Sequence, residues 1–477
     1  MPLTVLSDGD VNRILHSFTR DDILELQQSL ADALHWYSTS NDANDCCSDF
    51  QPERTHLKRK DGSTTLFMPA SAMSGQGIKV VNIVPPETSG LPALTENLSL
   101  KSSGSSVSSA RDSFSAASRS STDTSQTTAS SATPAPNSPA HANPPQGGSG
   151  QKPPVATIKG SLTLLDAQGN TTALINASEL TAFRTALAST LLLQIRQSVH
   201  EITVFGAGKQ AYWHTRLALL LRPKEIHHLN LVTRSFDSAQ SCMLRLRNPF
   251  PDDDGGDANN GFSPAPLDNS RTQKTILTPA HIEYDRLLKS YVRNSNAIFC
   301  TTPSSSPLFP GTHLTNPSGR KKGRYIACVG SYKPSMLELD PEVLRDAVAP
   351  HGGGGHVHLQ QRRQREGGAV VVDTVSGCLR EAGEVIQARL RPDQVVELGE
   401  LFMLKREAER LREERAGKVG KTEKGCEFQE SSGLRDWLTK GNVIYKSVGL
   451  GLMDVVVGNE VVSRARARGI GVTVDDF

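Results

Sequence analysis

The stretch Ile202-Thr203-Val204-Phe205-Gly206-Ala207-Gly208-Lys209-Gln210-Ala211 decides the fold of this chain. Its first four residues have the pattern of a buried strand, and a helical run follows to Leu221. Between them, the first glycine permits a tight turn, the second lets the backbone approach a pyrophosphate, and the small third position lets helix pack on strand. The helix start offers free N–H groups and a positive dipole end to phosphates. We predict a dinucleotide-binding turn with cofactor contacts from Gly206, Ala207, Gly208, Gln210 and Ala211; the alternative is a turn that binds nothing.

The next strand ends in Thr233-Arg234-Ser235, and these residues bear on the choice of cofactor. An enzyme that binds NAD usually has an acidic residue here, which accepts a hydrogen bond from the ribose 2′-hydroxyl. Arg234 and Ser235 instead suit a 2′-phosphate, through a charge-assisted contact and a hydroxyl hydrogen bond. The sequence therefore favours NADP over NAD. The alternative is that Arg234 lies on the surface and stacks on an adenine, as either cofactor permits.

Further apolar segments alternate with helical stretches after the glycine turn. Short strands are expected at 226–232, 296–300, 325–329 and 369–372, and this alternation predicts a doubly wound parallel sheet of the Rossmann type. Thr301 and Thr302 follow one of these strands. Because ligands of open α/β sheets bind beyond the carboxyl ends of the strands, we expect these hydroxyls to line the ribose or the nicotinamide. A plain Ser/Thr/Pro turn is the alternative.

The residues before the glycine turn predict an α+β domain. Strands are expected at 3–6, 64–68 and 78–84, a hairpin at 161–166 and 172–175, and helices at 21–36 and 178–198. Residues 101 to about 155 are mostly Ser, Thr, Ala and Pro, and such a segment cannot bury enough apolar surface to offset its ordering entropy. We expect a disordered insertion there, and further insertions at about 250–275, 350–368 and 404–427.

Composition excludes several classes of function. The chain has 477 residues and a formal net charge of +2, so nothing in its charge points to nucleic acid or an acidic membrane as a partner. Its seven cysteines have no CxxC spacing, which speaks against a zinc site and a disulfide scaffold. No signal peptide is recognised, and no apolar run reaches the roughly 18 residues of a membrane span. A cytoplasmic protein without a metal is expected.

Three cations stand out as candidates for a substrate site: Arg54, Lys79 and Arg184. Arg184 lies inside an otherwise apolar helix, where a charge is costly to bury without a partner. An anionic ligand is one such partner, since arginine binds a carboxylate through two parallel hydrogen bonds. The residues alone favour the alternative, a structural ion pair with an internal carboxylate.

Several motifs together resemble the ornithine cyclodeaminase/mu-crystallin family of NAD(P)-dependent enzymes, and they follow the family's order. They are Pro52-x-Arg54-Thr55, Met68-Pro69-Ala70, Gly77-Ile78-Lys79-Val80-Val81, Thr181-Ala182-Phe183-Arg184-Thr185-Ala186, the glycine turn with His214, Thr301-Thr302-Pro303-Ser304, Val329-Gly330-Ser331 with Pro334 and Glu338-Leu339-Asp340, Glu381-Ala382-Gly383-Glu384, and Lys446-Ser447-Val448-Gly449 with Asp454.

The resemblance implies an architecture and a site. A substrate-binding and dimerisation domain should span 1–195 and be completed by 440–477, with the NAD(P)-binding Rossmann domain at 196–439 and a homodimer as the assembly. In the family, the positions of Arg54, Lys79 and Arg184 hold the substrate carboxylate, and the lysine lies near the reacting carbon. An amino or imino acid is the implied substrate.

Two positions depart from the cyclodeaminases of this family. The resemblance implies that those enzymes have a glutamate just before the Met-Pro pair and an aspartate two residues after the glycine that matches Gly330. This chain has Leu66 and Tyr332 at these positions. Leucine moves no proton, and Tyr332 is a poor base near neutral pH. We therefore expect a reductase of an imino acid (ketimine), or the reverse oxidation of an amino acid, with Lys79 or Tyr332 as the proton donor. Ornithine cyclodeamination to proline and ammonia, and a non-catalytic NADPH-binding regulatory protein, are the alternatives.

Overall fold

The parallel sheet predicted from the glycine turn has eight strands. The computed structural model describes residues 2–39, 51–84, 157–250, 264–349, 369–402 and 432–477. In spatial order the strands are β13 (Val395–Glu397), β12 (Val370–Val372), β14 (Val443–Lys446), β11 (Tyr325–Cys328), β10 (Ala297–Cys300), β7 (Glu201–Phe205), β8 (His228–Val232) and β9 (Gln273–Leu277). All neighbours are parallel. The strand order reverses between β7 and β10, and open α/β sheets bind ligands beyond the carboxyl ends at such a point.

Helices cover this sheet on both faces, so its central strands β10, β11 and β14 are buried along their whole length. The helices are α4 (Lys209–Leu221), α5 (Phe236–Arg247), α6 (Tyr284–Asn294), α7 (Thr312–Thr315), α8 (Pro341–Val348), α9 (Val375–Glu381), α10 (Gly383–Ala388) and α12 (Ser432–Lys440), with a 3-10 turn at Pro392–Gln394. The predicted fold class, a Rossmann-type sheet with an α+β partner, is confirmed.

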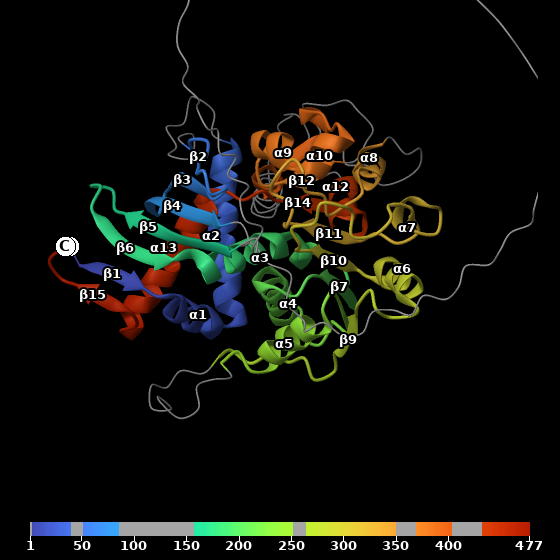
Figure 1. The fold of residues 1–477 in the computed structure, drawn as a ribbon, viewed down its shortest axis with the longest axis horizontal. Helices are drawn as coiled ribbons and strands as arrows, with labels where there is room; N and C mark the ends of the chain where they lie inside the picture. The colour runs from blue at the N-terminus through green and yellow to red at the C-terminus, as the bar shows by residue number, and fades with distance from the viewer. Residues whose placement is uncertain (1, 40–50, 85–156, 251–263, 350–368, 403–431) are drawn as a thin grey trace, which may run out of the picture. The chain divides into compact units, whose positions relative to one another are not determined.

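The second sheet has seven strands and is mixed. Its order is β15 (Val472–Val474), β1 (Leu3–Leu6), β6 (Thr171–Asn176), β5 (Thr157–Leu165), β4 (Gly75–Val84), β3 (Thr64–Ala72) and β2 (Thr55–Lys58), and only β1 and β6 are parallel neighbours among these described strands. The helices α2 (Arg20–Thr39), α3 (Ala177–Ile195) and α13 (Gly451–Arg468) pack near its strands, and α13 contacts β3, β4 and β5 (Figure 1). The short helix α1 (Asp8–Ser17) begins at Ser7, whose hydroxyl accepts from the Asp10 N–H.

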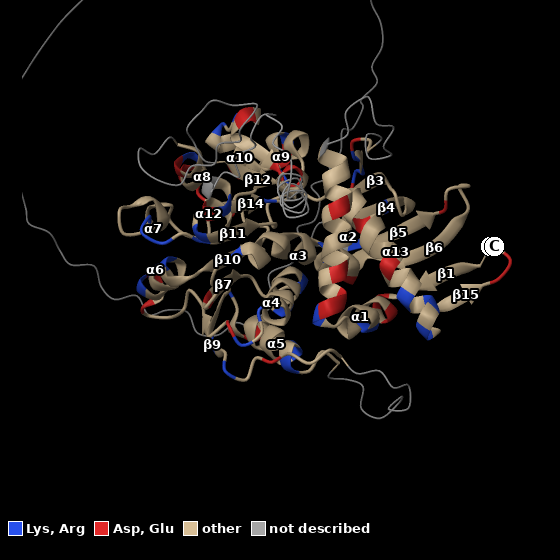
Figure 2. Ribbon diagram, turned by 180° about the vertical axis from the view of Figure 1, so that it is seen from behind, with Lys and Arg blue, Asp and Glu red and all other residues tan. Residues whose placement is uncertain are grey.

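Helix α3 joins the two sheets. It contacts β5 of the mixed sheet and β11 of the parallel sheet, and it packs along α4. Because both sides of α3 are covered, its Ala- and Leu-rich sequence is apolar around most of its circumference instead of along one stripe. Both sheets belong to one compact unit of residues 1–84 and 157–477. Basic and acidic residues are interspersed along the described elements (Figure 2).

The structure differs from the sequence prediction in three places. The strands β2, β9, β13, β14 and β15 were not predicted, and β9 begins inside the range 250–275 that was expected to be an insertion; residues 251–263 of that range lie outside the described residues. Strand β14 belongs to the parallel sheet, so the chain returns to the mixed sheet after Lys446 and not at residue 440. The expected insertions 101–155, 350–368 and 404–427 lie outside the described residues. Among the described helices, none is long and apolar enough to span a membrane.

Candidate functional site

The glycine turn has the geometry that a dinucleotide requires. Gly206 has a φ of +113°, its N–H donates to the Val232 carbonyl at 2.9 Å, and a Cβ there would lie 2.8 Å from Thr301 Oγ1. Gly208 begins α4 without a side-chain cap, and a Cβ added to it would meet nothing within 4 Å. No side chain therefore caps the start of α4 or fills the space beside the Gly208 Cα, where a pyrophosphate would approach the backbone. Ala211 is fully buried and lets α4 approach the sheet, whereas Gln210 Oε1 is buried with no hydrogen-bond partner within the described ranges.

The end of β8 places Arg234 and Ser235 differently. The Arg234 side chain is exposed, and no hydrogen bond or ion pair is formed by it within the described part of the chain. Ser235 is the N-cap of α5, and its hydroxyl oxygen accepts from the Ser238 N–H at 3.3 Å. The guanidinium is thus accessible for a phosphate, and the Ser235 hydroxyl keeps its own proton to donate. The assignment of both residues to a 2′-phosphate stays a prediction.

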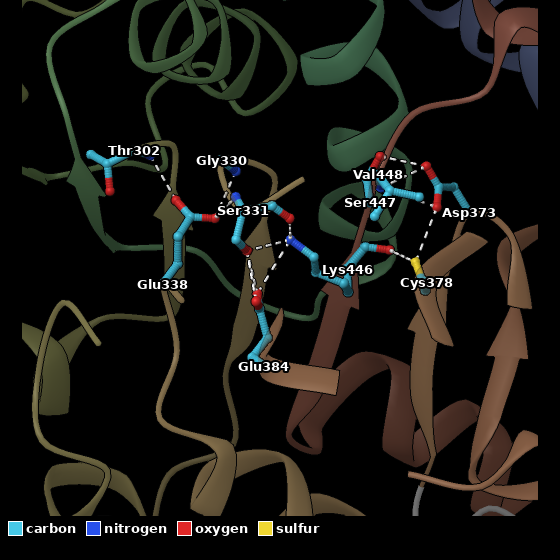
Figure 3. Close-up of polar contacts among 10 residues, drawn as sticks. All are labelled: Thr302, Gly330, Ser331, Glu338, Asp373, Cys378, Glu384, Lys446, Ser447 and Val448. Carbon is cyan, nitrogen blue, oxygen red and sulfur yellow. Dashed lines mark hydrogen bonds and ion pairs between the residues drawn. The ribbon is translucent and has the colours of Figure 1, made fainter. Parts of the chain in front are cut away.

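A buried carboxylate, Glu338, connects the two loops that follow β10 and β11. Its Oε1 accepts from the Thr302 N–H at 2.6 Å, and its Oε2 accepts from the N–H groups of Gly330 and Ser331 at 2.6 and 3.1 Å (Figure 3). Burial and the neighbouring Glu384 raise the pKa of Glu338 to about 7. Three donated N–H groups satisfy the ionised form, so Glu338 fixes the positions of both loops at the carboxyl edge of the sheet.

The predicted threonines lie in the first of these loops. Thr301 Oγ1 donates to the Phe205 carbonyl at 2.6 Å, so this hydroxyl holds the β10 loop against the glycine turn. Thr302 Oγ1 is buried and has no hydrogen-bond partner in the residues that the structure describes. A buried hydroxyl without a partner is costly, and a ligand atom is one way to satisfy it. Thr302 is therefore the better placed of the two for a direct contact.

A second buried network extends from Ser331 to the end of β14. Lys446 Nζ donates to the Ser331 carbonyl and hydroxyl, both at 2.6 Å, and lies 3.2 Å from Glu384 Oε1 (Figure 3). Ser331 Oγ in turn donates to Glu384 at 2.7 Å. Although burial opposes it, the charges of Glu384 and Glu338 raise the pKa of Lys446. The lysine therefore stays charged and ties the β11 loop to the segment 447–450.

Tyr332 follows this network and is half-buried. Burial raises the pKa of its hydroxyl, so the group is protonated at neutral pH. No hydrogen bond of this hydroxyl is formed within the described residues, and the Lys333 Nζ lies 5.7 Å from the ring centroid. A protonated hydroxyl can donate a proton but cannot accept one as a base. The assignment of Tyr332 as a proton donor stays a prediction.

Asp373 holds the other end of the segment 447–450. It follows β12 and is almost completely buried. Its Oδ2 accepts from Ser447 Oγ at 2.6 Å, and the Val448 N–H lies 3.1 Å from the same oxygen (Figure 3). The Gly449 N–H also donates to Oδ2, at 2.6 Å. These bonds hold Gly449 at a φ of +90°, and the carbonyls of Val448 and Gly449 accept from Arg54.

The three predicted cations meet at this segment. Arg54 donates to the Gly449 carbonyl at 2.8 Å and pairs with Glu381 at 3.3 Å. The Arg184 guanidinium lies against Gly449, where a Cβ would come within 2.9 Å of its Nη2. Lys79 Nζ and Arg184 Nε both contact one oxygen of Asp454, at 2.8 and 3.1 Å. Burial, together with Arg184 and Arg54, lowers the pKa of Lys79 to about 8, although Asp454 opposes the shift.

Leu66 shares the face of the mixed sheet that carries Lys79. Lys79 is opposite Met68 in the β3–β4 register, and Leu66 lies two residues before Met68, so all three side chains point to the helix-covered face. Leu66 is buried. The position where the cyclodeaminases of the resembled family have a carboxylate is therefore apolar here.

Sequence reasoning assigned no role to Glu338, Asp373, Glu384, Lys446 and Asp454. Four of them occur within the quoted motifs. Asp373 occurs in none of them. In the described ranges, no group of three or more His, Cys, Asp or Glu residues is arranged to hold a metal ion.

These features define the class of the protein: a Rossmann-type α/β protein with a glycine-rich dinucleotide turn and a second, mixed sheet. No family model matches the sequence. The chain is 24% identical to a Dictyostelium discoideum protein named as an uncharacterized cyclodeaminase, over 67% of this chain and 73% of that one. It is 23% identical to a Bacillus cereus Δ1-pyrroline-2-carboxylate reductase, over 67% and 75% of the two chains.

Two solved structures have a similar fold. One is the Thermococcus litoralis Δ1-pyrroline-2-carboxylate reductase in complex with NADH and L-proline, with a TM-score of 0.57, 16% identity, and 99% of this chain and 100% of that one covered. The other is an archaeal alanine dehydrogenase dimer with bound NAD, with a TM-score of 0.56, 16% identity and full coverage of both chains. The resemblance to the ornithine cyclodeaminase/mu-crystallin family, predicted from the motifs, is confirmed by these relatives.

Proposed function

We propose that this protein is an NADPH-dependent reductase of α-imino acids, which can also run the reverse oxidation of the amino acid. One observation carries the proposal: Arg54, Lys79 and Arg184 converge from three separate elements on the segment 448–454. In the described residues they pair with only two carboxylates, Glu381 and Asp454. Because three cations exceed two anions by one, the cluster suits a single added carboxylate.

The chain's residues support a nicotinamide cofactor at the glycine turn. Gly206 and Gly208 would admit the pyrophosphate, and the unpartnered hydroxyl of Thr302 would bind nearer the nicotinamide end. The exposed guanidinium of Arg234 and the hydroxyl of Ser235 favour the 2′-phosphate of NADP. The cofactor, when bound, supplies or accepts a hydride.

Lys79 is the proton donor that we favour. With a pKa of about 8 it is mostly charged at neutral pH and close enough to neutrality to release its proton. As hydride adds to the imine carbon, the electron pair of the C=N bond moves to nitrogen, which takes a proton from Lys79 Nζ. Tyr332 is the alternative donor. The apolar Leu66 disfavours cyclodeamination, because no carboxylate at that position assists attack of water on an imine.

The proposal is tested by NADPH oxidation with Δ1-pyrroline-2-carboxylate, Δ1-piperideine-2-carboxylate, and pyruvate with an amine. We expect turnover on at least one of them, preference for NADPH over NADH, and loss of turnover in Arg184→Ala. If no substrate turns over while NADPH stabilises the fold, the protein is an NADPH-binding regulator. Release of ammonia and proline from ornithine would instead identify a cyclodeaminase.

A homodimer through the uncovered face of the mixed sheet is part of the proposal. Phe67, Ile78 and Leu174 lie on the face opposite the buried Met68 and are 38–40% exposed. Contiguous exposed apolar side chains on a sheet mark an association surface. We expect Ile78→Asp to convert a dimer into a monomer in light scattering. Ile282→Asp, at a fully exposed isoleucine in the loop after β9, is the control that should leave the mass unchanged.

We propose a cytoplasmic location, and the thiols support it. Cys242, Cys300, Cys328 and Cys378 are free and buried. Free thiols are typical of a reducing compartment, which supports the cytoplasm as the site of the reaction.

A further inference from the structure

Asp454 lies at the centre of the cation cluster. It belongs to the first turn of α13 and is completely buried. Its Oδ1 is the shared acceptor of Lys79 on β4 and Arg184 on α3. Its Oδ2 has no hydrogen-bond partner within the described residues. A carboxylate whose two contacts both fall on one oxygen is under-satisfied for a group so deeply buried.

The surroundings of Lys79 leave Asp454 as the carboxylate that faces it. The strand neighbours of Lys79 are Met68 on β3 and Leu162 on β5, and neither carries a charge. The charged groups around it are Asp454 from α13, Arg184 from α3 and Arg54 from the segment before β2. Both arginines favour loss of the Lys79 proton, and burial favours it too. Asp454 alone among these groups favours its retention.

The start of a helix is a favourable place for this charge. α13 has no side-chain cap at its N-terminus, and Asp454 lies within its first turn. The positive end of the helix dipole favours a negative charge at this position, as do the two cations that contact Oδ1. The carboxylate can therefore act as a fixed charge for its neighbours.

We propose that Asp454 is a positioning residue of the substrate site: it holds the Lys79 ammonium and the Arg184 guanidinium at one point and sets the pH range in which Lys79 can donate a proton. This inference rests on the proposed reduction. It assigns Asp454 no contact with substrate. It explains why a lysine buried between two arginines stays charged at neutral pH.

The test is the pH dependence of reduction in Asp454→Asn. A donor must be protonated, so the rate falls as pH rises through the Lys79 pKa, near 8 in the wild type. This fall in rate is the alkaline limb of the pH profile. Loss of the opposite charge should shift the limb to a pH lower by about one unit or more. The protonated fraction at about pH 8 then falls from roughly half to roughly a tenth, which gives about a fivefold loss, with little loss at about pH 6. An equal loss at both values overturns the proposal.

Two variants serve as controls. Glu381→Gln removes the carboxylate that pairs with Arg54 and does not contact Lys79, so it should leave the limb in place while it raises KM. Asp454→Glu keeps the charge and should restore the limb toward its wild-type position. A limb that shifts equally in Glu381→Gln, or stays shifted in Asp454→Glu, contradicts the assignment.

Binding without turnover separates this proposal from the proposed function. Pyrrole-2-carboxylate is a planar carboxylate that cannot be reduced, and calorimetry in the presence of NADP+ follows its affinity against pH. Affinity should fall as Lys79 loses its charge, and should fall at lower pH in Asp454→Asn, whether or not any imino acid is turned over. Equal pH profiles overturn the role of Asp454.

If Asp454→Asn folds poorly, the unfolding temperatures of this variant and of a double variant test the proposal instead. Two buried cations would then lack their shared anion, and an uncompensated buried charge is strongly destabilising. Adding Lys79→Met removes one of them, so the double variant should unfold at a higher temperature than Asp454→Asn alone. A double variant that is no more stable overturns the proposal, because Asp454 would then act independently of Lys79.

Discussion

Replacing Gly206 by alanine should destabilise the fold by an amount that follows from the turn geometry. At a φ of +113° a Cβ is strained, and strain of this kind costs about 1–3 kcal/mol. The new Cβ would lie 2.8 Å from Thr301 Oγ1 and would displace the hydroxyl from its bond to the Phe205 carbonyl, at a cost of about 1 kcal/mol. We expect a total of about 2–4 kcal/mol, or a melting temperature lower by roughly 4–16 °C.

Gly208→Ala is the matched variant, which should weaken NADPH binding while it leaves the stability of the free protein nearly unchanged. At φ −84° and ψ −171° alanine is unstrained, and its Cβ meets nothing within 4 Å, so the stability of the free protein should change by less than about 0.5 kcal/mol. The methyl group would stand where a pyrophosphate approaches the backbone. NADPH affinity should fall at least about tenfold, which is about 1.4 kcal/mol.

Differential scanning calorimetry with and without NADPH measures both effects. A ligand at about 100 times its Kd stabilises the fold by about 2.7 kcal/mol, and a tenfold loss of affinity reduces this to about 1.4 kcal/mol. The reasoning fails if Gly206→Ala melts with the wild type. It also fails if Gly208→Ala gains as much stability from NADPH as the wild type does, because the turn would then not approach the phosphates.

Three further variants test the site. Arg234→Ala should raise KM for NADPH by roughly 10- to 100-fold through loss of a charge-assisted contact, with KM for NADH unchanged; equal effects on both cofactors would place Arg234 away from the 2′-phosphate. Glu338→Gln leaves at least one of three buried N–H groups without an acceptor and should lower the free energy of unfolding by about 1–3 kcal/mol in guanidinium titrations, whereas Glu342→Gln on the exposed side of α8 should change it by less than about 0.5 kcal/mol. Lys79→Met should lower kcat by about 10²- to 10⁴-fold and Tyr332→Phe should leave it within about twofold in stopped-flow assays; the reverse pattern would make Tyr332 the donor.

Local patterns predicted most of the elements, because they depend on neighbouring residues. The hairpin of β5 and β6 and the glycine turn have local signatures in spacing and residue type. The edge strands β2 and β9 were missed for a physical reason. β2 is exposed along its whole length, and β9 is exposed at its first two residues and half-buried at the next two, so neither shows the alternation that marks a half-buried strand.

The site also contains residues that the sequence singled out and residues that only the structure shows. Arg54, Lys79 and Arg184 were singled out from the sequence as charges that need partners, and the structure supplies those partners. Glu381 occurs in a quoted motif, and only the structure shows that it is largely buried against Arg54. Asp454 is 375 residues from Lys79 in the chain, and no local pattern connects them.

The sequence by itself determined the class of fold, since the strand, the two glycines and the helix after Phe205 describe a dinucleotide turn through short-range sterics and backbone hydrogen bonding. It also identified the cations, because a charge in an apolar helix stands out without coordinates. Only the tertiary structure decided how those charges are balanced. Glu338, Asp373 and Asp454 act through loops and helices that are distant in the chain, and the cost of burying a charge depends on partners that only packing brings within hydrogen-bond distance.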